Sequence, residues 1–183
     1  MILFINACVK KESRTLRLAK RVLSGLGGQY EEVKLHEIDF PVTDQDFLNR
    51  RDRLIASEDF GDSMFELARQ FAKADEIVIA APYWDLSFPA SLKQYIEHIN
   101  VLGVTFRYTS EGTPVGLCRA KSLTYVMTAG GMYVPEEFGY GYVKTLAQSF
   151  YGIPEVRLIK ATGLDIYGAD VGTIMREAEE TMG

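Results

Sequence analysis

The sequence has few of the residues from which metal sites and disulfide frameworks are built. Its 183 residues include only two cysteines and two histidines, and these lie far apart. We therefore expect no metal site, and we expect reduced thiols, the usual state in the cytosol. No apolar run approaches the ~20 residues of a membrane span, and residues 1–6 lack the basic segment of a signal peptide. The sequence thus predicts a cytoplasmic protein that does not contact a membrane.

Positive charge is also scarce. Lysine and arginine number 20 against 25 aspartates and glutamates, which leaves a net charge of −5. Nucleic-acid-binding proteins carry a basic surface, so we expect no nucleic-acid partner. The hydrophobic fraction of 47% is too high for a disordered chain, and the length suits one compact unit. We predict a single domain over residues 1–183, with an excursion near 103–120.

Strand and helix patterns alternate along the chain. Short apolar runs that suit strands occupy residues 2–6, 77–81, 122–128 and 156–161, and a weaker alternation at residues 32–35 suggests a further strand. Apolar residues at helical spacing occupy residues 16–26, 64–72, 92–102, 143–150 and 171–182. The charged segment 43–59 is expected to be a helical or irregular excursion. The alternation predicts an α/β fold with a mostly parallel five-stranded sheet covered on both faces, and such sheets bind ligands beyond the carboxyl ends of their strands.

The loop after the first predicted strand contains no glycine. This absence disfavours a P-loop and a dinucleotide fingerprint, because both need glycines. Ser13 and Thr15 are natural helix N-cap residues, and the free N–H groups at a helix start attract phosphate. Lys10, Lys11 and Arg14 add positive charge nearby. The loop therefore predicts a phosphate site, although an ordinary cap on a solvated basic loop has the same pattern.

Two further loops at this edge of the sheet suit a planar ligand. Tyr83, Trp84 and Phe88 follow the third predicted strand and offer flat apolar surface, either for stacking a ring or for sealing the core. Gly130 and Gly131 follow the fourth strand and either let the backbone approach a ligand closely or form a tight turn. Together the three loops fit a phosphorylated planar heterocycle, for which flavin mononucleotide (FMN) is the natural candidate.

Residues 81–133 carry several motifs in a fixed order. They read P-Y-W-D-L-S-F-P-A-S-L-K-Q-Y-I-E from Pro82, G-V-T-F-R-Y-T from Gly103, G-x-P-x-G-L from Gly112 and T-A-G-G from Thr128. In this order they resemble the flavodoxin-like FMN-dependent NAD(P)H oxidoreductases known as azoreductases and quinone reductases. The resemblance implies a three-layer, flavodoxin-like sandwich with strand order 2-1-3-4-5.

The resemblance also implies a reaction and its participants. FMN would be the prosthetic group, and NADH or NADPH would be the electron donor. Hydride would pass through N5 of the flavin to quinones, azo compounds or nitroaromatics by a ping-pong mechanism, so no side chain is expected to be catalytic. The partners would be a small aromatic acceptor and a second copy of the chain, in a homodimer with a flavin near each subunit boundary.

Several positions match those that hold the flavin in this family. The resemblance implies contacts with the phosphate for Ser13, Arg14 and Thr15, with Cys8, where the family often has Ser, near them. It implies contacts with the ring and ribityl chain for Tyr83, Trp84, Asp85 and Leu86, and with the polar edge of the ring for Thr128, Ala129, Gly130 and Gly131. Phe106 and Tyr108 are expected to roof the substrate pocket, unless they form a hairpin that packs on its own domain.

The sequence departs from the family pattern at two positions near the ring. Asp85 stands where the family often has Asn, and Ala129 stands where it often has Arg. Asp85 adds negative charge and Ala129 removes a cation, so the nicotinamide preference and the flavin potential do not carry over. These departures keep open two other interpretations, a flavodoxin-type electron carrier and an inactive flavin-binding protein. Carriers usually have a glycine-containing phosphate loop rich in Ser and Thr, whereas this loop is basic.

Overall fold

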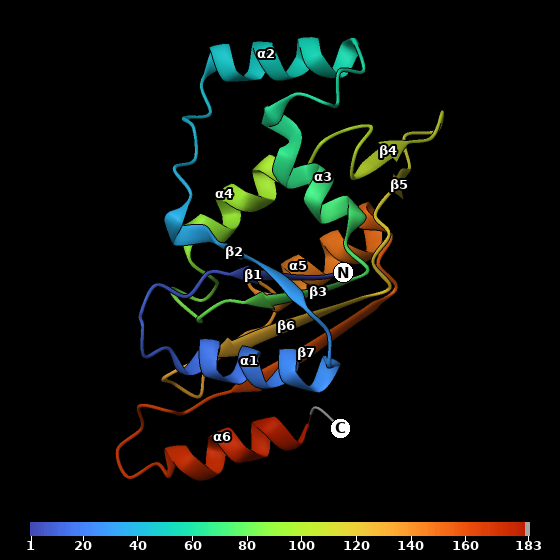
Figure 1. Ribbon diagram of the computed structural model, residues 1–183. Helices are drawn as coiled ribbons and strands as arrows, with labels where there is room; N and C mark the ends of the chain where they lie inside the picture. Colours follow the sequence, from blue (N-terminus) through green and yellow to red (C-terminus); the bar gives the residue numbers. More distant parts are fainter. Residues whose placement is uncertain (182–183) are drawn as a thin grey trace.

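The core of the molecule is a parallel sheet whose central strands are buried on both faces. In the computed structural model, which describes residues 1–181, the sheet contains β1 (Ile2–Asn6), β2 (Tyr30–Lys34), β3 (Glu76–Ala80), β6 (Ser122–Thr128) and β7 (Glu155–Ala161). The strands pair in parallel in the order β2-β1-β3-β6-β7, with β2 and β7 at the two sides (Figure 1). Numbered within the sheet along the chain, this is the order 2-1-3-4-5, so the predicted fold and strand order are confirmed.

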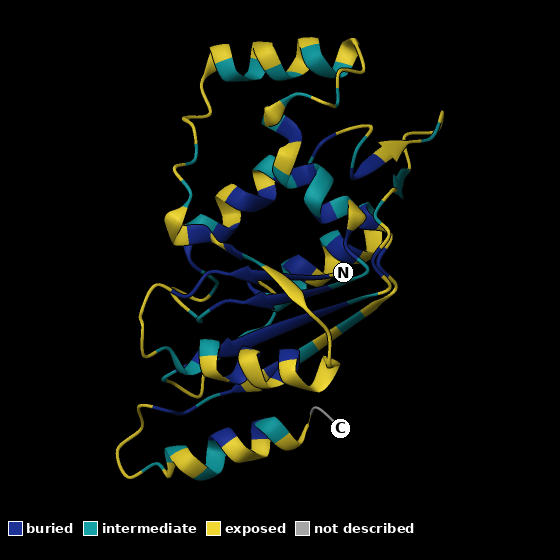
Figure 2. Ribbon diagram, in the orientation of Figure 1, coloured by how far each residue is buried: buried dark blue, intermediate teal, exposed yellow. Residues whose placement is uncertain are grey.

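Helices cover both faces of the sheet. One face carries α3 (Glu66–Lys73), α4 (Ala90–Ile99) and α5 (Tyr140–Leu146), and the other carries α1 (Arg14–Leu26) and α6 (Val171–Glu180). Short 3-10 turns lie at Leu35–Glu37 and Ser63–Phe65. Each face has its own hydrophobic core. Because successive strand residues point to opposite faces, Leu3 and Ile5 enter the core under α3, α4 and α5, while Ile2 and Phe4 enter the core under α1 and α6. Figure 2 shows the buried residues concentrated in the strands and on the inner sides of these helices.

Some helix ends differ from the predicted ones. The helix α4 ends at Ile99, earlier than the predicted residue 102, and Thr105 Oγ1 satisfies the Ile99 carbonyl at this end by donating a hydrogen bond of 2.7 Å. The helix α5 continues into a π-helical turn, Ala147–Tyr151. The closing helix was predicted to reach Met182, which lies outside the described residues. Among residues 1–181, no helix combines the length and apolar character needed to cross a membrane.

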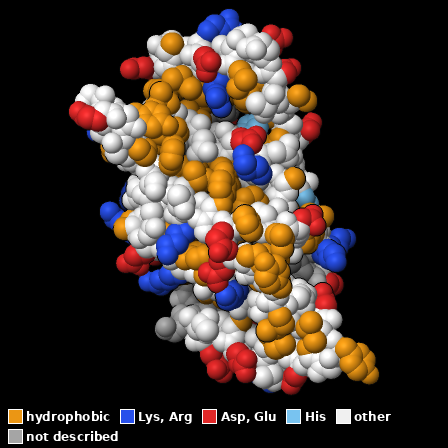
Figure 3. Space-filling model, turned by 180° about the vertical axis from the view of Figure 1, so that it is seen from behind, with side chains coloured by type: hydrophobic (Ala, Val, Ile, Leu, Met, Phe, Trp, Pro, Cys, Tyr) orange, Lys and Arg blue, Asp and Glu red, His pale blue; other side chains and the backbone are white. Residues whose placement is uncertain are grey.

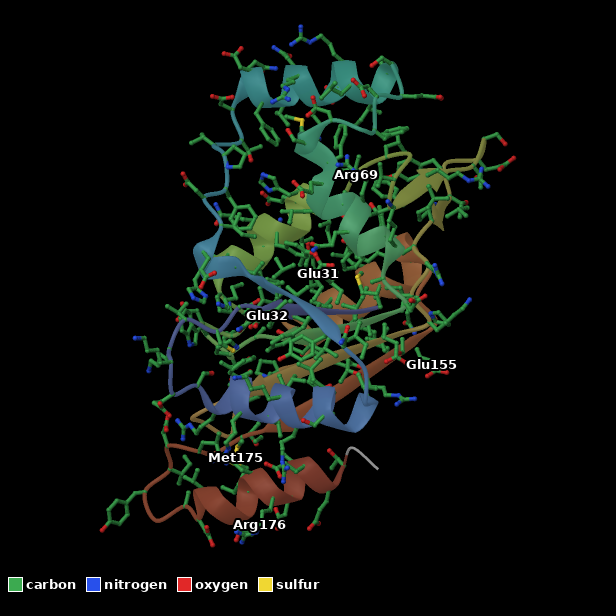
Figure 4. The ribbon with its side chains drawn as sticks, viewed as in Figure 1. Glu31, Glu32, Arg69, Glu155, Met175 and Arg176 are labelled. Carbon is green, nitrogen blue, oxygen red and sulfur yellow. The ribbon has the colours of Figure 1, made fainter. Side chains whose placement is uncertain are left out.

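The charged segment 43–59 forms a helix at the periphery of the molecule. This helix, α2 (Gln45–Ala56), begins after Asp44, whose carboxylate accepts a backbone N–H of the first turn. None of the residues of α2 is buried, and Figure 1 shows it beyond α3 and α4. The guanidinium of Arg69, labelled in Figure 4, donates to backbone carbonyls of the segment that joins α2 to α3. The excursion is therefore a helix at the margin of the core on the α3, α4 and α5 face, against which its partly buried Leu54 and Ile55 pack.

The segment 103–120 contains a hairpin at the end of the sheet where the strands begin, which we call the amino edge. Its strands, β4 (Phe106–Tyr108) and β5 (Pro114–Gly116), pair antiparallel just before the chain enters β6 (Figure 1). The hairpin packs closely on the turn after α5. A Cβ atom on Gly116 would lie 2.1 Å from the backbone carbon of Tyr151, so only glycine fits there.

Candidate functional site

A cleft of about 250 Å³ opens at the other end of the sheet, the carboxyl edge, where the loops after β1, β3, β6 and β7 meet. The structure brings most of the predicted flavin-contacting residues into its wall: Ser13, Arg14, Thr15, Tyr83, Trp84, Thr128, Ala129 and Gly130. Further lining residues are Val9, Lys10, Glu12, Pro82 and Asp165. Cys8, Asp85, Leu86 and Gly131 belong to the same loops but do not line the cleft. Within residues 1–181, no three His, Cys, Asp or Glu side chains are grouped to hold a metal ion.

The first turn of α1 forms one wall of the cleft. Ser13 is the N-cap, as its sequence position predicted, and its Oγ accepts the N–H of Leu16 at 3.2 Å. Its carbonyl accepts the N–H of Arg17 at 3.0 Å. The N–H groups of Arg14 and Thr15 come too early in the helix to reach a carbonyl within it. They are therefore free to donate to an anion in the cleft.

Thr15 is not a second cap residue but a buried link to the sheet. Its hydroxyl lies 2.7 Å from the hydroxyl of Thr128, at the end of β6. Both residues are buried, with exposed fractions of 1% and 9%. The hydrogen bond fixes the start of α1 against the loop that follows β6. The two loops are thus held at a set spacing on either side of the cleft.

Asn6 orients the first loop, a role that the sequence reasoning missed. Its amide oxygen accepts the N–H of Cys8 at 2.9 Å, and its amide nitrogen donates to the Glu32 carboxylate at 2.8 Å. Glu32, labelled in Figure 4, comes from the neighbouring strand β2. A buried amide at the end of an apolar strand is the only sequence signal for this role. Burial raises the pKa of the Cys8 thiol to about 11, so the thiol is protonated at neutral pH.

A tight turn presents the aromatic side chains of the second loop. Trp84 and Ser87 exchange backbone hydrogen bonds of 3.1 and 2.7 Å across the turn. The two central residues, Asp85 and Leu86, have φ angles of 50° and 65°, a left-handed conformation that is unfavourable for leucine. The Ser87 hydroxyl donates to the Phe138 carbonyl at 2.6 Å, which ties the turn to the loop after β6. The indole of Trp84 is thereby left 42% exposed at the cleft.

The loop after β7 contributes Asp165, which the sequence reasoning did not single out. Its carboxylate packs on Gly130, where a Cβ atom would lie 2.2 Å from Asp165 Oδ2. Asp165 Oδ1 also lies 2.6 Å from Nη2 of Arg14. The Arg14 guanidinium, for which a phosphate contact was predicted, is therefore already paired with a carboxylate. An acidic residue after the last strand was the only signal in the sequence.

Phe106 and Tyr108 are not brought to the cleft of their own chain. They lie in the hairpin at the amino edge, where the Phe106 ring contacts the rings of Tyr108 and Phe150 at centroid distances of 5.5 and 5.0 Å. Phe106 is 8% exposed, whereas Tyr108 is 49% exposed. The packed-hairpin alternative thus describes their position within one chain.

The residues of the cleft fit a phosphorylated planar group. The N–H groups at the start of α1 and the ammonium of Lys10 suit a phosphate at one end. The exposed indole of Trp84 suits a flat ring at the other. The close packing of Gly130 leaves no side chain between that ring and the backbone of the loop after β6.

Comparison with known proteins agrees with this fit. A family model described as a flavodoxin-like fold matches residues 1–183. The FMN-dependent NADH:quinone oxidoreductase of Lachnoclostridium phytofermentans is 38% identical over 100% of this chain and 96% of its own length. This chain belongs to the flavodoxin-like family of FMN-dependent NADH:quinone oxidoreductases. The enzyme of the same name from Clostridium perfringens strain SM101 is 36% identical over 98% of this chain and 94% of its own length. These relatives confirm the family that the motifs of residues 81–133 indicated.

Solved structures show the same fold. The azoreductase of Bacillus anthracis strain Sterne superimposes with a TM-score of 0.81 at 23% identity and covers 99% of this chain and 95% of that chain. An FMN-dependent NADH-azoreductase of Bacillus anthracis strain Ames Ancestor, solved in complex with FMN, has a TM-score of 0.77 at 23% identity, with coverage of 99% and 96%. These likenesses concern the arrangement of the sheet and its helices.

Proposed function

We propose that this protein is an FMN-dependent oxidoreductase that transfers two electrons from NADH to small aromatic acceptors such as quinones and azo compounds. The observation that carries the proposal is the cleft at the carboxyl edge, where backbone N–H groups without an acceptor in the first turn of α1 lie in the same wall as the exposed indole of Trp84. FMN, when bound, supplies the hydride chemistry, as flavins do in general. The chain would bind FMN, orient it, and provide N–H donors that stabilise negative charge on the reduced cofactor.

The start of α1 is the proposed phosphate site. The N–H groups of Arg14 and Thr15 point out of the first turn and can donate to phosphate oxygens. The hydroxyl of Ser13 already caps the helix, so its Oγ is held beside the same site. Lys10 adds a positive charge to the wall of the cleft. This end of the cleft would fix the position of the cofactor along its length.

The loops after β3 and β6 are the proposed ring site. Tyr83 and Trp84 line the cleft and offer flat surface against the isoalloxazine. The backbone at Gly130 and Gly131 can approach the polar edge of the ring, where N–H donors would stabilise negative charge on the reduced cofactor. Asp85 and Leu86 are proposed to shape the turn that carries the indole, since neither side chain lines the cleft.

The donor and the acceptor are proposed to use the same place in turn, which is a ping-pong mechanism. Large apolar side chains are exposed on the loops around the mouth of the cleft: Trp84, Leu86, Met132, Tyr133, Phe138, Ile166 and Tyr167. Figure 3 shows hydrophobic side chains toward the lower right, where the carboxyl edge lies in that view. This surface suits any flat aromatic acceptor, so we include nitroaromatics beside quinones and azo compounds.

We also propose that the protein is a cytoplasmic homodimer with a flavin near each subunit boundary. The exposed apolar residues around the cleft favour a partner surface there. The positions of Phe106 and Tyr108 add a geometric condition. Since their hairpin lies at the amino edge, they can roof a substrate pocket only if they come from a second copy of the chain. The cysteines Cys8 and Cys118 are both free, in keeping with a reducing compartment.

Turnover with defined substrates tests the proposed activity. FMN-loaded protein should oxidise NADH steadily in the presence of menadione, and protein stripped of flavin should not. Parallel double-reciprocal plots are expected if donor and acceptor alternate at one place. Rapid-mixing reduction by NADH and by NADPH, without acceptor, would measure the donor preference. Flavin binding without turnover would support the electron-carrier alternative instead, and failure to take up FMN would overturn the proposal.

A further inference from the structure

We infer that Asp165 weakens the selection of phosphorylated over unphosphorylated flavin by occupying the guanidinium of Arg14. The inference rests on the proposed function, because it assumes that the cleft binds FMN. It assigns the side chain of Arg14, though not its backbone N–H, to the wall of the cleft rather than to the phosphate. It also makes Asp165, which lies 151 positions further along the chain, a specificity-determining residue.

The guanidinium of Arg14 makes two contacts with the loop after β7. Its Nη2 lies 2.6 Å from Asp165 Oδ1, and its Nη1 donates to the Leu164 carbonyl at 3.0 Å. Arg14 is also the first residue of α1, so its backbone N–H lies at the proposed phosphate site while its side chain bridges away to the neighbouring loop. The backbone and the side chain of one residue thus serve different partners.

Asp165 is held in place by more than its ion pair. Its N–H donates to the Gly130 carbonyl at 3.0 Å, and the preceding residue, Leu164, donates to the Ala129 carbonyl at 3.2 Å. Its carboxylate lies against Gly130, where a Cβ atom would be 2.2 Å away. The loops after β6 and β7 are therefore joined along their backbones. A phosphate that required the Arg14 guanidinium would have to compete with a carboxylate fixed at short range.

The cleft wall has few other charges, so the competition between Asp165 and a phosphate for the Arg14 guanidinium affects how strongly the cleft attracts the phosphate. The wall contains two cations, Lys10 and Arg14, and two carboxylates, Glu12 and Asp165. Because Asp165 neutralises Arg14 locally, a phosphate entering the cleft meets the backbone N–H groups and Lys10 as its principal attraction. Removing the carboxylate would return one positive charge to the phosphate. Removing the guanidinium would leave an unpaired negative charge beside it.

Two substitutions in opposite directions test the inference. In flavin-free protein, Asp165→Asn should tighten the Kd for FMN about three- to fivefold, the size expected of one exposed charge pair. The Kd for riboflavin, which has no phosphate, should stay unchanged. Arg14→Gln should weaken FMN binding by at least the same factor and again leave riboflavin unchanged. The double variant removes both charges, so its Kd for FMN should return close to that of the wild type. Raising the salt concentration should reduce each FMN effect.

Asp170→Asn is the matched control, since it makes the same charge change in the same connection between β7 and α6. Asp170 caps α6, a role that Asn fills equally well, and it does not line the cleft. Flavin fluorescence quenching measures all the Kd values, and thermal melts check that each variant is folded. An unchanged or weaker FMN Kd in Asp165→Asn, or an equal shift for riboflavin, would overturn the inference while leaving the proposed function intact. A wild-type protein that binds neither flavin would overturn both.

Discussion

The two edges of the sheet both carry aromatic side chains, but they use them in opposite ways. At the amino edge, the rings of Phe106, Tyr108 and Phe150 contact one another edge to face, with centroid distances of 5.0 to 6.4 Å. At the carboxyl edge, Phe88 packs on Tyr142 at a centroid distance of 5.9 Å, but Trp84 and Tyr133 are 42% and 79% exposed, and within residues 1–181 neither of these two contacts another ring. Rings that pack on one another stabilise the fold, whereas exposed rings without a ring partner remain available for a ligand. The comparison predicts that substitutions at one edge change stability and substitutions at the other change binding.

The largest expected effect is on stability, at the amino edge. Gly116→Ala places a methyl group against the backbone of Tyr151, at 2.1 Å, so the hairpin must move. We expect the free energy of unfolding to fall by about 3 kcal/mol, while folded protein keeps its FMN affinity. Urea unfolding measures the first quantity and FMN titration the second. Gly112→Ala is the control, because it has a φ of +79° but open space around it, and it should cost about 1 kcal/mol. Equal losses for the two variants would contradict the packing argument.

The next effect concerns the link between the two sides of the cleft. Thr15→Val leaves the Thr128 hydroxyl buried without its partner at 2.7 Å. Such a loss should lower the free energy of unfolding by about 1–2 kcal/mol. The double variant with Thr128→Val removes both hydroxyls and should cost less than the sum of the two single variants. Urea unfolding of all three proteins measures the coupling. Strict additivity would show that the hydrogen bond does not join the loops.

At the carboxyl edge, binding should change more than stability. Trp84→Ala removes the exposed indole from the cleft wall. We expect FMN to bind about tenfold more weakly, equivalent to about 1.4 kcal/mol of lost stacking. The free energy of unfolding should change by less than about 1 kcal/mol, since the side chain is half exposed. Tyr30→Ala, at a ring on β2 that is likewise 42% exposed but lies outside the cleft, is the matched control. Equal weakening by both variants would contradict the assignment of Trp84 to the ring site.

The smallest effect near neutral pH concerns the two thiols, one at each edge. Burial raises the pKa of Cys8 from 9.0 to about 11 and that of Cys118 from 9.0 to about 12. A raised pKa means that folding favours the protonated thiol, so this contribution is complete below pH 9 and is lost as the pH rises toward 11 for Cys8. Urea unfolding across this range should show a fall in stability that Cys8→Ser makes shallower. An identical slope in Cys8→Ser would contradict the assignment.

Local patterns predicted the elements of the structure, and long-range pairing decided the details of the site. Short apolar runs were enough for β1, β3, β6 and β7, whereas the weak alternation at residues 32–35 located β2 (Tyr30–Lys34) only approximately. Ser13 was recognisable as a cap because its hydrogen bond is made three positions along the chain. Thr15 has the same local signal, yet it pairs with Thr128 across 113 positions. The pairing of Arg14 with Asp165 spans 151 positions. No local spacing carries such information, because these partners meet only after β6 and β7 have been placed in the sheet.

The hairpin shows the same limit from the other direction. Its motif from Gly103 resembles that of the flavin enzymes, and the resemblance implied a role over the pocket for Tyr108. The structure places the hairpin at the amino edge of its own chain, because it immediately precedes β6. Whether its rings meet a ligand depends on a second copy, which no pattern within one chain can position.

The most direct test of the central claim uses Trp84 as its own reporter. It is the only tryptophan in the sequence, so tryptophan emission comes from the wall of the cleft alone. Emission excited selectively from tryptophan should be followed while FMN is added to flavin-free protein. Binding at the carboxyl edge predicts quenching that saturates at one FMN per chain, in step with the loss of flavin fluorescence. FMN that binds without changing the tryptophan emission, or that does not bind, would contradict the account.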